Sequence, residues 1–230
     1  MSDITYRMLP LPAVLMMVAE VPDKIVDQMN NYLDKLLLQE DRKSSANTLV
    51  GQISQGEQLS MDHKSKELTE VRFFLQDIAI QYVLDFFHST GQKLDGDRHI
   101  EIDELWSVHS YAGDYNPIHD HGTKTTMGIS CTTWTKVPEQ ITNQAEASEK
   151  GFSLYNSSGS CDGYLEFVYG PSAVWDKERL KPTQMAMFKP TVGNIYVFPS
   201  WLQHMVYPFK GEGERRTVAA NFNAFPKEKE

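Results

Sequence analysis

The sequence predicts a mainly β fold with flanking helices: a jelly-roll core preceded by an N-terminal helical region. From residue 100 onward, short apolar-alternating segments are separated by Gly, Pro, Asn and Asp, as in strands joined by turns. Before residue 95, apolar residues recur at helical spacing instead. Many short strands in succession indicate a β-sandwich or barrel, and a jelly-roll leaves a mouth where ligands can converge.

The 230 residues suit one integrated domain with two regions. Residues 1–98 are expected to form a mostly helical support region, and residues 99–230 the jelly-roll core. Helices are predicted over residues 24–36 and 67–87, where apolar side chains share one face. A polar, turn-rich connector over residues 41–62 separates them.

The core is expected to consist of short strands interrupted by two polar segments. The predicted strands are residues 101–111, 126–136, 163–169, 184–189, 193–198, 203–209 and 215–225. The polar segments, residues 138–162 and 170–183, are rich in Ser, Asn, Glu and Lys. Because long loops at one end of a sandwich often carry function, we expect both segments to form flexible flaps over the barrel mouth.

Charge and cysteine usage narrow the class of protein. With 22 basic and 31 acidic residues, a net charge of −9 and no basic cluster, nucleic acid is disfavoured as the main partner. The isolated cysteines Cys131 and Cys161 indicate a reducing compartment and no zinc ribbon. Neither a signal peptide nor a membrane span is visible. We therefore expect a cytoplasmic protein with a small-molecule or peptide substrate and no membrane partner; the oligomeric state stays open, a homodimer being one alternative.

Three histidines form the strongest candidate site. His119 and His121 lie two residues apart in the segment 116–122, and the strand period of two points both to the same side. His204 lies far downstream, after Phe198-Pro199. Such a close pair with a distant histidine can hold one face of Fe(II), leaving the opposite face open for a co-substrate and O₂.

The identity of the third metal ligand stays open at this point. The usual triad is His-x-Asp/Glu…His, but the second position here holds His121 rather than a carboxylate. Asp120 is adjacent, yet along a regular strand it would point away, and only a bulge would turn it inward. His121 is favoured over Asp120, and His109 could also line the site.

Arg215 is the candidate for binding a co-substrate carboxylate. A five-carbon diacid that chelates iron through its keto-acid end needs a buried, bidentate cation at its far end. On a strand antiparallel to that of His204, Arg215 and Thr217 share the inward face, and Arg216 takes the other face as a surface residue. Residues 210–213 supply the turn between the two strands.

Four segments of the C-terminal half contain further motifs. They are Tyr111-x-Gly113 continuing to His119, Gly163-x-Leu165-x-Phe167, residues 190–206 and residues 213–222. Over about residues 100–225 they resemble the 2-oxoglutarate/Fe(II)-dependent oxygenases, specifically the small members of phages and marine bacteria that are related to prolyl-4-hydroxylases. The missing carboxylate two residues after His119 is the departure from that family.

The resemblance implies a double-stranded β-helix core, with Fe(II), 2-oxoglutarate as co-substrate and O₂. It also implies release of succinate and CO₂ while a substrate is hydroxylated, by analogy a peptidyl proline. By similarity, Tyr111 and Trp134 would line the co-substrate pocket, although Trp134 is equally explained by core packing. The alternatives are a three-histidine, cupin-type metal dioxygenase that needs no 2-oxoglutarate, and a non-catalytic jelly-roll binding module.

Overall fold

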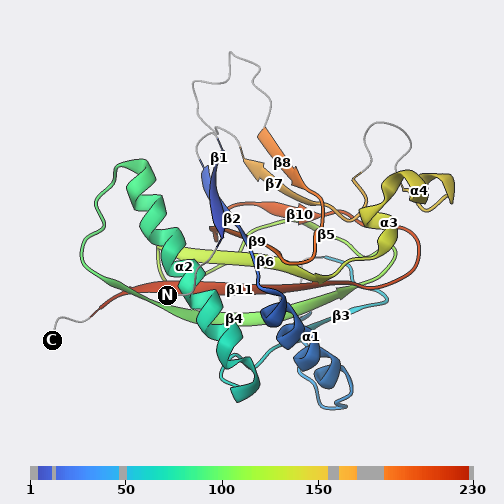
Figure 1. Cartoon of the computed structure of the whole chain (residues 1–230), viewed down its shortest axis with the longest axis horizontal. Coiled ribbons are helices and arrows are strands. Elements are labelled where there is room, and N and C mark those ends of the chain that lie inside the picture. The colour runs from blue at the N-terminus through green and yellow to red at the C-terminus, as the bar shows by residue number, and fades with distance from the viewer. Residues whose placement is uncertain (1–4, 12–13, 47–50, 155–160, 170–183, 228–230) are drawn as a thin grey trace.

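Two antiparallel sheets form the centre of the molecule, as a computed structural model shows (Figure 1). The structure describes residues 5–11, 14–46, 51–154, 161–169 and 184–227. One sheet has seven strands and the other has four. The predicted fold class, mainly β with a jelly-roll core and flanking helices, is confirmed.

The strands pair as follows. Across the seven-stranded sheet lie β1 (Tyr6–Leu11), β2 (Val14–Glu20), β9 (Asn194–Pro199), β6 (Gly128–Lys136), β11 (Arg215–Pro226), β4 (Arg98–Ser110) and β3 (Glu57–Ser60). Across the four-stranded sheet lie β5 (Asn116–His119), β10 (His204–Val206), β7 (Leu165–Tyr169) and β8 (Gln184–Phe188). All of these pairings are antiparallel.

The N-terminal region contributes strands as well as helices, which differs from the mostly helical region that the sequence predicts. β1, β2 and β3 all belong to the seven-stranded sheet. The reason is visible in β2, where Met16 and Met17 are both fully buried although they face opposite sides of the sheet. A strand that is buried on both faces has no polar alternation, so periodicity does not distinguish it from a helix.

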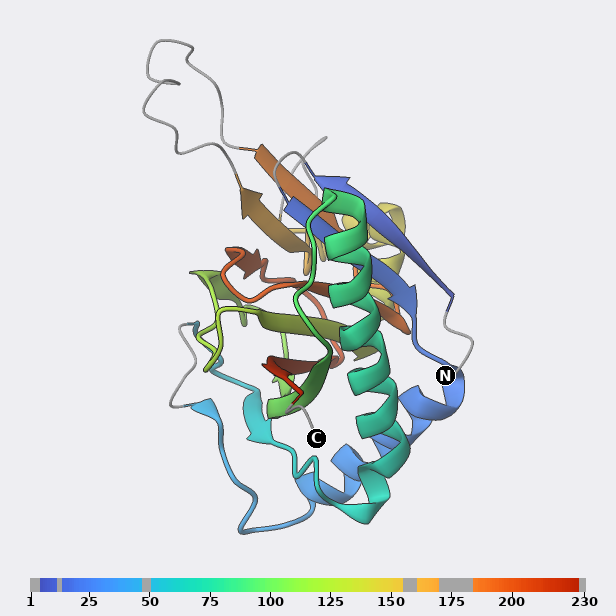
Figure 2. The same cartoon turned by 90° about the vertical axis from the view of Figure 1, so that its left-hand side faces the viewer.

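Two long helices cover the outer face of the seven-stranded sheet (Figures 1 and 2). α1 (Asp23–Leu37) and α2 (Thr69–Thr90) match the two predicted helices, and η2 (Lys66–Leu68) leads into α2. α2 ends at Gly91, whose left-handed conformation (φ 66°) is the usual helix C-cap. These helices leave the inner face of the sheet to the four-stranded sheet.

The apolar core divides between the two faces of the large sheet. The outer cluster lies under α1 and α2 and includes Cys131, a buried thiol. The inner cluster lies between the sheets and is rich in aromatic residues: Trp134, Phe167, Tyr196 and Phe198. A close-packed inner cluster of this kind gives a rigid support for side chains on the inner face.

The described part of the first polar segment, residues 138–154, is not a simple loop. α3 (Glu139–Thr142) and α4 (Gln144–Glu149) occupy much of the first segment. Residues 155–160, and the whole of residues 170–183, lie outside the described residues. The expectation of flexible flaps therefore stays a prediction.

A partly buried charge network joins α1 to the start of β11. Arg216 is 1% exposed and binds Glu214 through Nε–Oε1 (2.7 Å) and Nη2–Oε2 (3.1 Å). Its Nη1 reaches Asp34 at 2.8 Å and Asn30 at 3.2 Å, and His109 Nδ1 lies 2.6 Å from Glu214. The expectation that Arg216 is a surface residue is therefore wrong, because α1 covers this face of the sheet.

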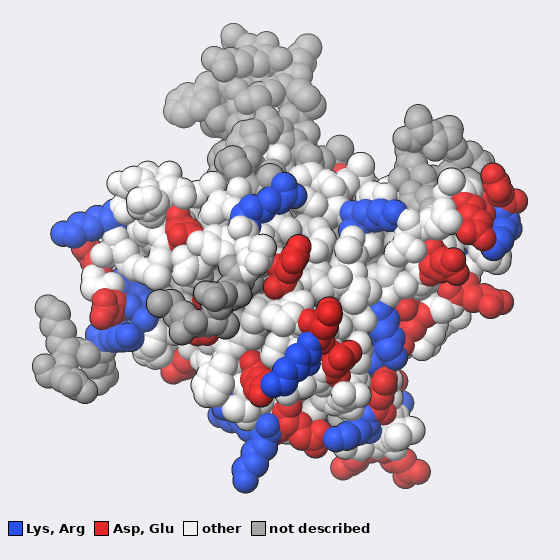
Figure 3. Space-filling view, in the orientation of Figure 1, with Lys and Arg blue, Asp and Glu red and all other residues white. Residues whose placement is uncertain are grey.

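Acidic and basic side chains are interspersed over the visible face of the molecule (Figure 3). That distribution agrees with a net charge of −9 without a basic stretch on this face. None of the helices within the described ranges has the length and apolar character needed to cross a membrane.

We expect Arg216→Ala to destabilise the fold by about 3 kcal/mol, because it removes a fully buried side chain and takes the bidentate partner from the largely buried Glu214, leaving His109 as its close partner. Urea unfolding followed by circular dichroism measures this loss. Arg42→Ala is the control, since the Arg42–Glu57 pair is one-third exposed on both sides and its loss should be much smaller. Equal losses in the two variants would contradict the structural role of the network.

The same network predicts a pH dependence. Burial alone would raise the pKa of Glu214, but the hydrogen bonds from His109 and Arg216 outweigh it and lower the pKa to about 2. A depressed carboxyl pKa stabilises the fold above the unfolded-state value, and that contribution is lost as pH falls from about 4.5 towards 2. The stability difference between the native chain and Glu214→Gln should therefore shrink over this range in urea titrations. A difference independent of pH would contradict the assignment.

Candidate metal centre

Three histidines converge at the mouth of the barrel. His119 ends β5, His121 follows it, and His204 begins β10, directly opposite His119 in the pairing of the two strands. One ring nitrogen of each lies within 4.8 Å of the others. The ring centroids are 4.3 Å apart for His119–His204 and 4.8 Å for His121–His204. The structure thus brings together all three histidines that the sequence singles out.

Two of the rings are held by a backbone carbonyl two residues before them. His119 Nδ1 lies 2.8 Å from the Pro117 oxygen, and His204 Nδ1 lies 3.0 Å from the Leu202 oxygen. A carbonyl can only accept, so each Nδ1 carries the proton and Nε2 keeps its lone pair. His119 Nε2 accepts from Asn116 Nδ2 at 3.1 Å, a bond that a metal would replace.

His121 is oriented by side chains of the inner face. Its Nδ1 lies 2.9 Å from Asn221 Oδ1 and 3.0 Å from Ser130 Oγ. Asn221 Nδ2 donates to Glu104 at 3.4 Å, which turns the amide oxygen towards the imidazole. His121 therefore also donates from Nδ1 and leaves Nε2 free. The sequence argument missed Asn221, although alternation along the strand from Arg215 places both on one face.

The electrostatics of the site favour neutral imidazoles. Burial lowers the pKa of His119, and burial together with the neighbouring His119 lowers the pKa of His121 to about 4. Burial also lowers the pKa of His204 well below its usual value. Neutral imidazole is the form that binds a divalent metal, so the three rings are ready ligands at neutral pH.

Asp120 does not join the cluster. Its side chain is exposed, and the group of close potential ligands in the described ranges contains His121 instead. The backbone NH of His121 donates to the Ser200 oxygen at 2.9 Å, which holds this segment against the turn after β9. The geometry agrees with the choice of His121 over Asp120.

Arg215 lies between the two sheets. It is 2% exposed, and its Nη1 donates to the carbonyls of Gly163 (3.0 Å) and Tyr207 (2.9 Å) beside the four-stranded sheet. Its Nε has no hydrogen-bond partner, and no carboxylate of the described residues forms an ion pair with it. Burial lowers its pKa to about 10, so it stays charged at neutral pH.

Arg215 reaches the interior by a different route from the one expected. β11 and β10 belong to different sheets and are not paired, so the arginine faces the strand of His204 across the interior. Gly211 and Gly213, at φ 110° and 95°, lie in the turn predicted between them. Tyr207, which Arg215 contacts, is three residues beyond His204, or about 10 Å along an extended chain.

The other residues predicted to bind the co-substrate are Thr217, Trp134 and Tyr111, and they lie in different surroundings. Thr217 is partly exposed on the inner face beside Arg215, opposite Trp134 in the strand pairing. Trp134 is 2% exposed and packs edge-on against Tyr196, 5.5 Å away. Tyr111 follows β4 and is partly exposed, and burial together with the nearby Glu214 raises its pKa.

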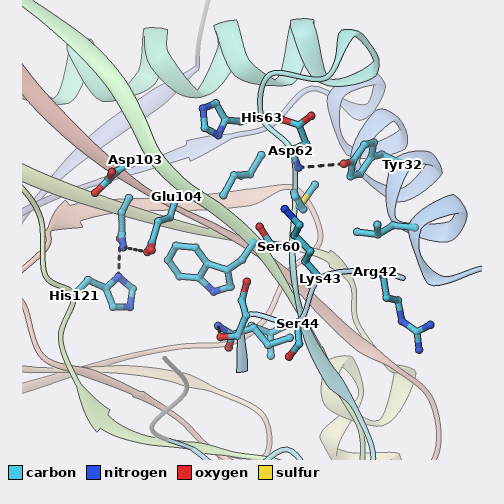
Figure 4. Close-up of a pocket in the computed structure, with 18 of the residues that line it drawn as sticks. Tyr32, Arg42, Lys43, Ser44, Ser60, Asp62, His63, Asp103, Glu104 and His121 are labelled. Atoms are coloured by element: carbon cyan, nitrogen blue, oxygen red, sulfur yellow. Dashed lines mark hydrogen bonds between the residues drawn. The ribbon is translucent and has the colours of Figure 1, made fainter. Parts of the chain in front are cut away.

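A cavity of about 1060 Å³ opens at the histidines (Figure 4). Its wall includes His119 and His121 from the site, Trp106 from β4, and residues of the segments 39–45 and 58–64. Arg215 does not line it. The cavity thus adjoins His119 and His121, whereas Arg215 is buried between the sheets outside its lining.

A family model agrees with this site. The family described as "Putative 2OG-Fe(II) oxygenase" matches residues 104–221, which is about half of the chain and contains all three histidines and Arg215. A comparison with curated proteins finds no match.

Solved structures share the fold at low sequence identity. A prolyl-4-hydroxylase of Pseudomonas putida is 12% identical, with 96% of this chain and 94% of that chain covered and a TM-score of 0.51. The α-ketoglutarate-dependent carbocyclase SnoK from nogalamycin biosynthesis is 10% identical, with 96% and 81% covered and a TM-score of 0.57. HygX from Streptomyces hygroscopicus, solved with nickel, 2-oxoglutarate and hygromycin B, is 12% identical, with 90% and 82% covered and a TM-score of 0.53.

We expect His121→Ala to weaken metal binding by more than about tenfold, because it removes one of three converging imidazoles, whereas Asp120→Ala should change it little. Anaerobic titration calorimetry with Fe(II) measures both. His63→Ala is the matched control, since His63 lines the same cavity outside the cluster. A larger loss in Asp120→Ala than in His121→Ala would reverse the choice of ligand.

Proposed function

Because this chain belongs to the 2-oxoglutarate/Fe(II)-dependent oxygenase family, we propose that it hydroxylates an organic substrate with His119, His121 and His204 as the iron ligands. The enzyme class and its requirement for Fe(II), 2-oxoglutarate and O₂ follow from the family. The roles of individual residues are the proposal.

The three histidines fit a divalent iron. Their nitrogens lie within 4.8 Å of one another, each Nδ1 has an oxygen partner, and each Nε2 is left for the metal. Oxygen partners on the second nitrogen are the usual support of metal-bound histidine. Three neutral ligands on one side suit a borderline metal with vacant positions opposite.

The observation that carries the co-substrate assignment is the state of Arg215. A buried guanidinium with a free Nε and no direct ion pair in the described ranges, where the nearby buried Asp114 compensates its charge in part, is costly unless a further anion binds there. The far carboxylate of 2-oxoglutarate supplies that anion, with the hydroxyl of Thr217 on the same face. Arg215 contacts the carbonyl of Tyr207, three residues after His204, so the proposed anion site and the iron ligands adjoin the same segment of chain.

In this proposal the protein's own side chains hold the iron and the reactants in position and do not transfer protons. Iron and 2-oxoglutarate, when bound, would activate O₂ for hydroxylation of a C–H bond, one oxygen atom entering the product and the other entering the succinate that forms from 2-oxoglutarate with loss of CO₂. His119 and His204 fix one side of the centre through rings locked by Pro117 and Leu202. The packed aromatic cluster around Phe167 excludes water from the interior.

The identity of the substrate and the type of dioxygenase are further parts of the proposal. A peptidyl proline is what the prolyl-4-hydroxylase likeness suggests, and at 12% identity that likeness extends to the fold alone. A cupin-type dioxygenase would also use three histidines, so the His121 ligand favours it as the second candidate. It would need no 2-oxoglutarate, and the unpaired Arg215 supports the first candidate over it.

The test is release of succinate from 2-oxoglutarate by the Fe(II)-loaded chain, with and without added substrates such as a proline-rich peptide. We expect turnover that depends on both Fe(II) and 2-oxoglutarate. Oxygen uptake with a substrate but without 2-oxoglutarate would favour the cupin-type alternative. Absence of both would leave the binding-module alternative.

Arg215→Ala should raise the 2-oxoglutarate dissociation constant by more than about tenfold, because a buried charge pair loses one partner. Metal binding should be retained, since Arg215 contacts none of the three histidines. Titration of the Mn(II)-loaded chain with 2-oxoglutarate measures this. Arg42→Ala, which removes an arginine from the cavity wall, is the control and should leave the constant unchanged.

A further inference from the structure

The cavity beside His121 is free to hold a molecule other than 2-oxoglutarate. Arg215 and Thr217, the proposed co-substrate residues, do not line it, whereas His119 and His121 do. Its volume of about 1060 Å³ is at the upper end for pockets that bind small ligands. The substrate that is oxidised must reach the same histidines, so this cavity is its place.

The two ends of the cavity differ in charge. The basic residues of its wall, Arg42, Lys43 and Lys64, come from the connection between α1 and β3 and from the turn after β3. Figure 4 shows Arg42 near α1, away from His121, Lys43 beside Ser60 between the two ends, and Glu104 next to His121. Within the described lining, the β4 and β5 wall beside the histidines carries carboxylates and no basic side chain.

Trp106 and Glu104 form the wall nearest the metal centre. They are two residues apart on β4, so they share the inner face, where they pair with Ala219 and Asn221. Trp106 is flanked by small residues on both sides, Ala219 on β11 and Ser60 on β3. It is partly exposed, and its ring centroid lies 5.4 Å from that of His121.

Glu104 is available to a ligand. Glu104 is exposed and lines the cavity, and within the described residues its hydrogen-bond partner is Asn221, whose Nδ2 donates a long bond of 3.4 Å to Oε2. That leaves most of its acceptor capacity unused. The neighbouring Asp103, by contrast, is paired with Lys124.

An indole ring beside a carboxylate has a definite chemical preference. The negative face of tryptophan attracts cations, most strongly when the cation is partly desolvated. A carboxylate adds a charge-assisted hydrogen bond or an ion pair to the same group. Alkylammonium groups satisfy both partners, whereas carboxylates and phosphates are repelled by Glu104 and Asp120.

We propose that Trp106 and Glu104 form an ammonium-binding subsite, and that the substrate carries an alkylammonium group beside the carbon to be oxidised. This inference rests on the proposed function, because the histidines define which end of the cavity is reactive. The ammonium group belongs either to a small amine or to a lysine side chain of a peptide.

Binding of matched probe pairs to the Mn(II)- and 2-oxoglutarate-loaded chain tests the subsite, measured by ligand-observed NMR. Choline is compared with its neutral isostere 3,3-dimethylbutanol. N-acetyl-lysine amide is compared with the same compound acetylated on its side-chain nitrogen. We expect the cationic member of at least one pair to bind about tenfold tighter. A preference in the first pair alone indicates a small amine, and in the second pair a peptide.

Two variants test whether Glu104 and Trp106 cause the preference for the cationic probe. Glu104→Gln removes the charge but keeps an acceptor for Asn221, so it should reduce the cationic preference at least fivefold without loss of metal binding. Trp106→Leu should reduce it as well. Asp41→Asn is the matched control, since it removes the same charge from the wall on the α1 side and should leave the preference intact.

Equal affinity within both pairs, absence of probe binding, or an equal effect of Asp41→Asn and Glu104→Gln would overturn the subsite. The proposed function fails separately, if the chain does not bind Mn(II) and 2-oxoglutarate. The same titrations on the metal-free chain distinguish these results, because Trp106 and Glu104 need no metal to prefer a cation.

Discussion

The register of β11 between β4 and β6 is the constraint on which the rest of the structure depends. Its inner face carries Arg215, Thr217 and Asn221, and its outer face carries Arg216 and Phe222. A slip of one residue would exchange the two faces and turn both the arginine and the histidine support away from the site. The Arg216 network and the apolar packing under α2 hold the outer face in place, and thereby fix the inner one.

The histidine cluster depends on both sheets. His204 is placed by β10 and His119 by its partner β5, both in the four-stranded sheet, whereas His121 is oriented by Asn221 of the seven-stranded sheet. The candidate metal centre therefore depends on residues of both sheets. A ligand set built in this way holds its geometry only while the inner aromatic cluster keeps the sheets at a fixed separation.

Arg215 and the cavity at the histidines differ in character. Arg215 is buried between the sheets and has a guanidinium Nε without a hydrogen-bond partner. The cavity beside His119 and His121 is large and lined by side chains of both charges. The proposed function accordingly assigns the constant co-substrate to Arg215 and the substrate to the cavity.

The sequence by itself determined the residue types of the site and the faces they occupy. The spacing of His119 and His121, the distant His204 and the alternation of Arg215 with Arg216 are local properties, because strand geometry fixes which side each residue faces. The same alternation placed Asn221 on the face of Arg215, although its role as the partner of His121 needed the structure.

Only the tertiary structure decided which segments cover the two faces of the seven-stranded sheet. The burial of Arg216 under α1 joins residues 34 and 216, and the cavity joins the segment 39–45 to β4 and to the histidines. β2 enters the sheet beside β9 because both of its faces are buried. These features arise from contacts between segments far apart in the chain, and such contacts leave no periodic trace in the local sequence.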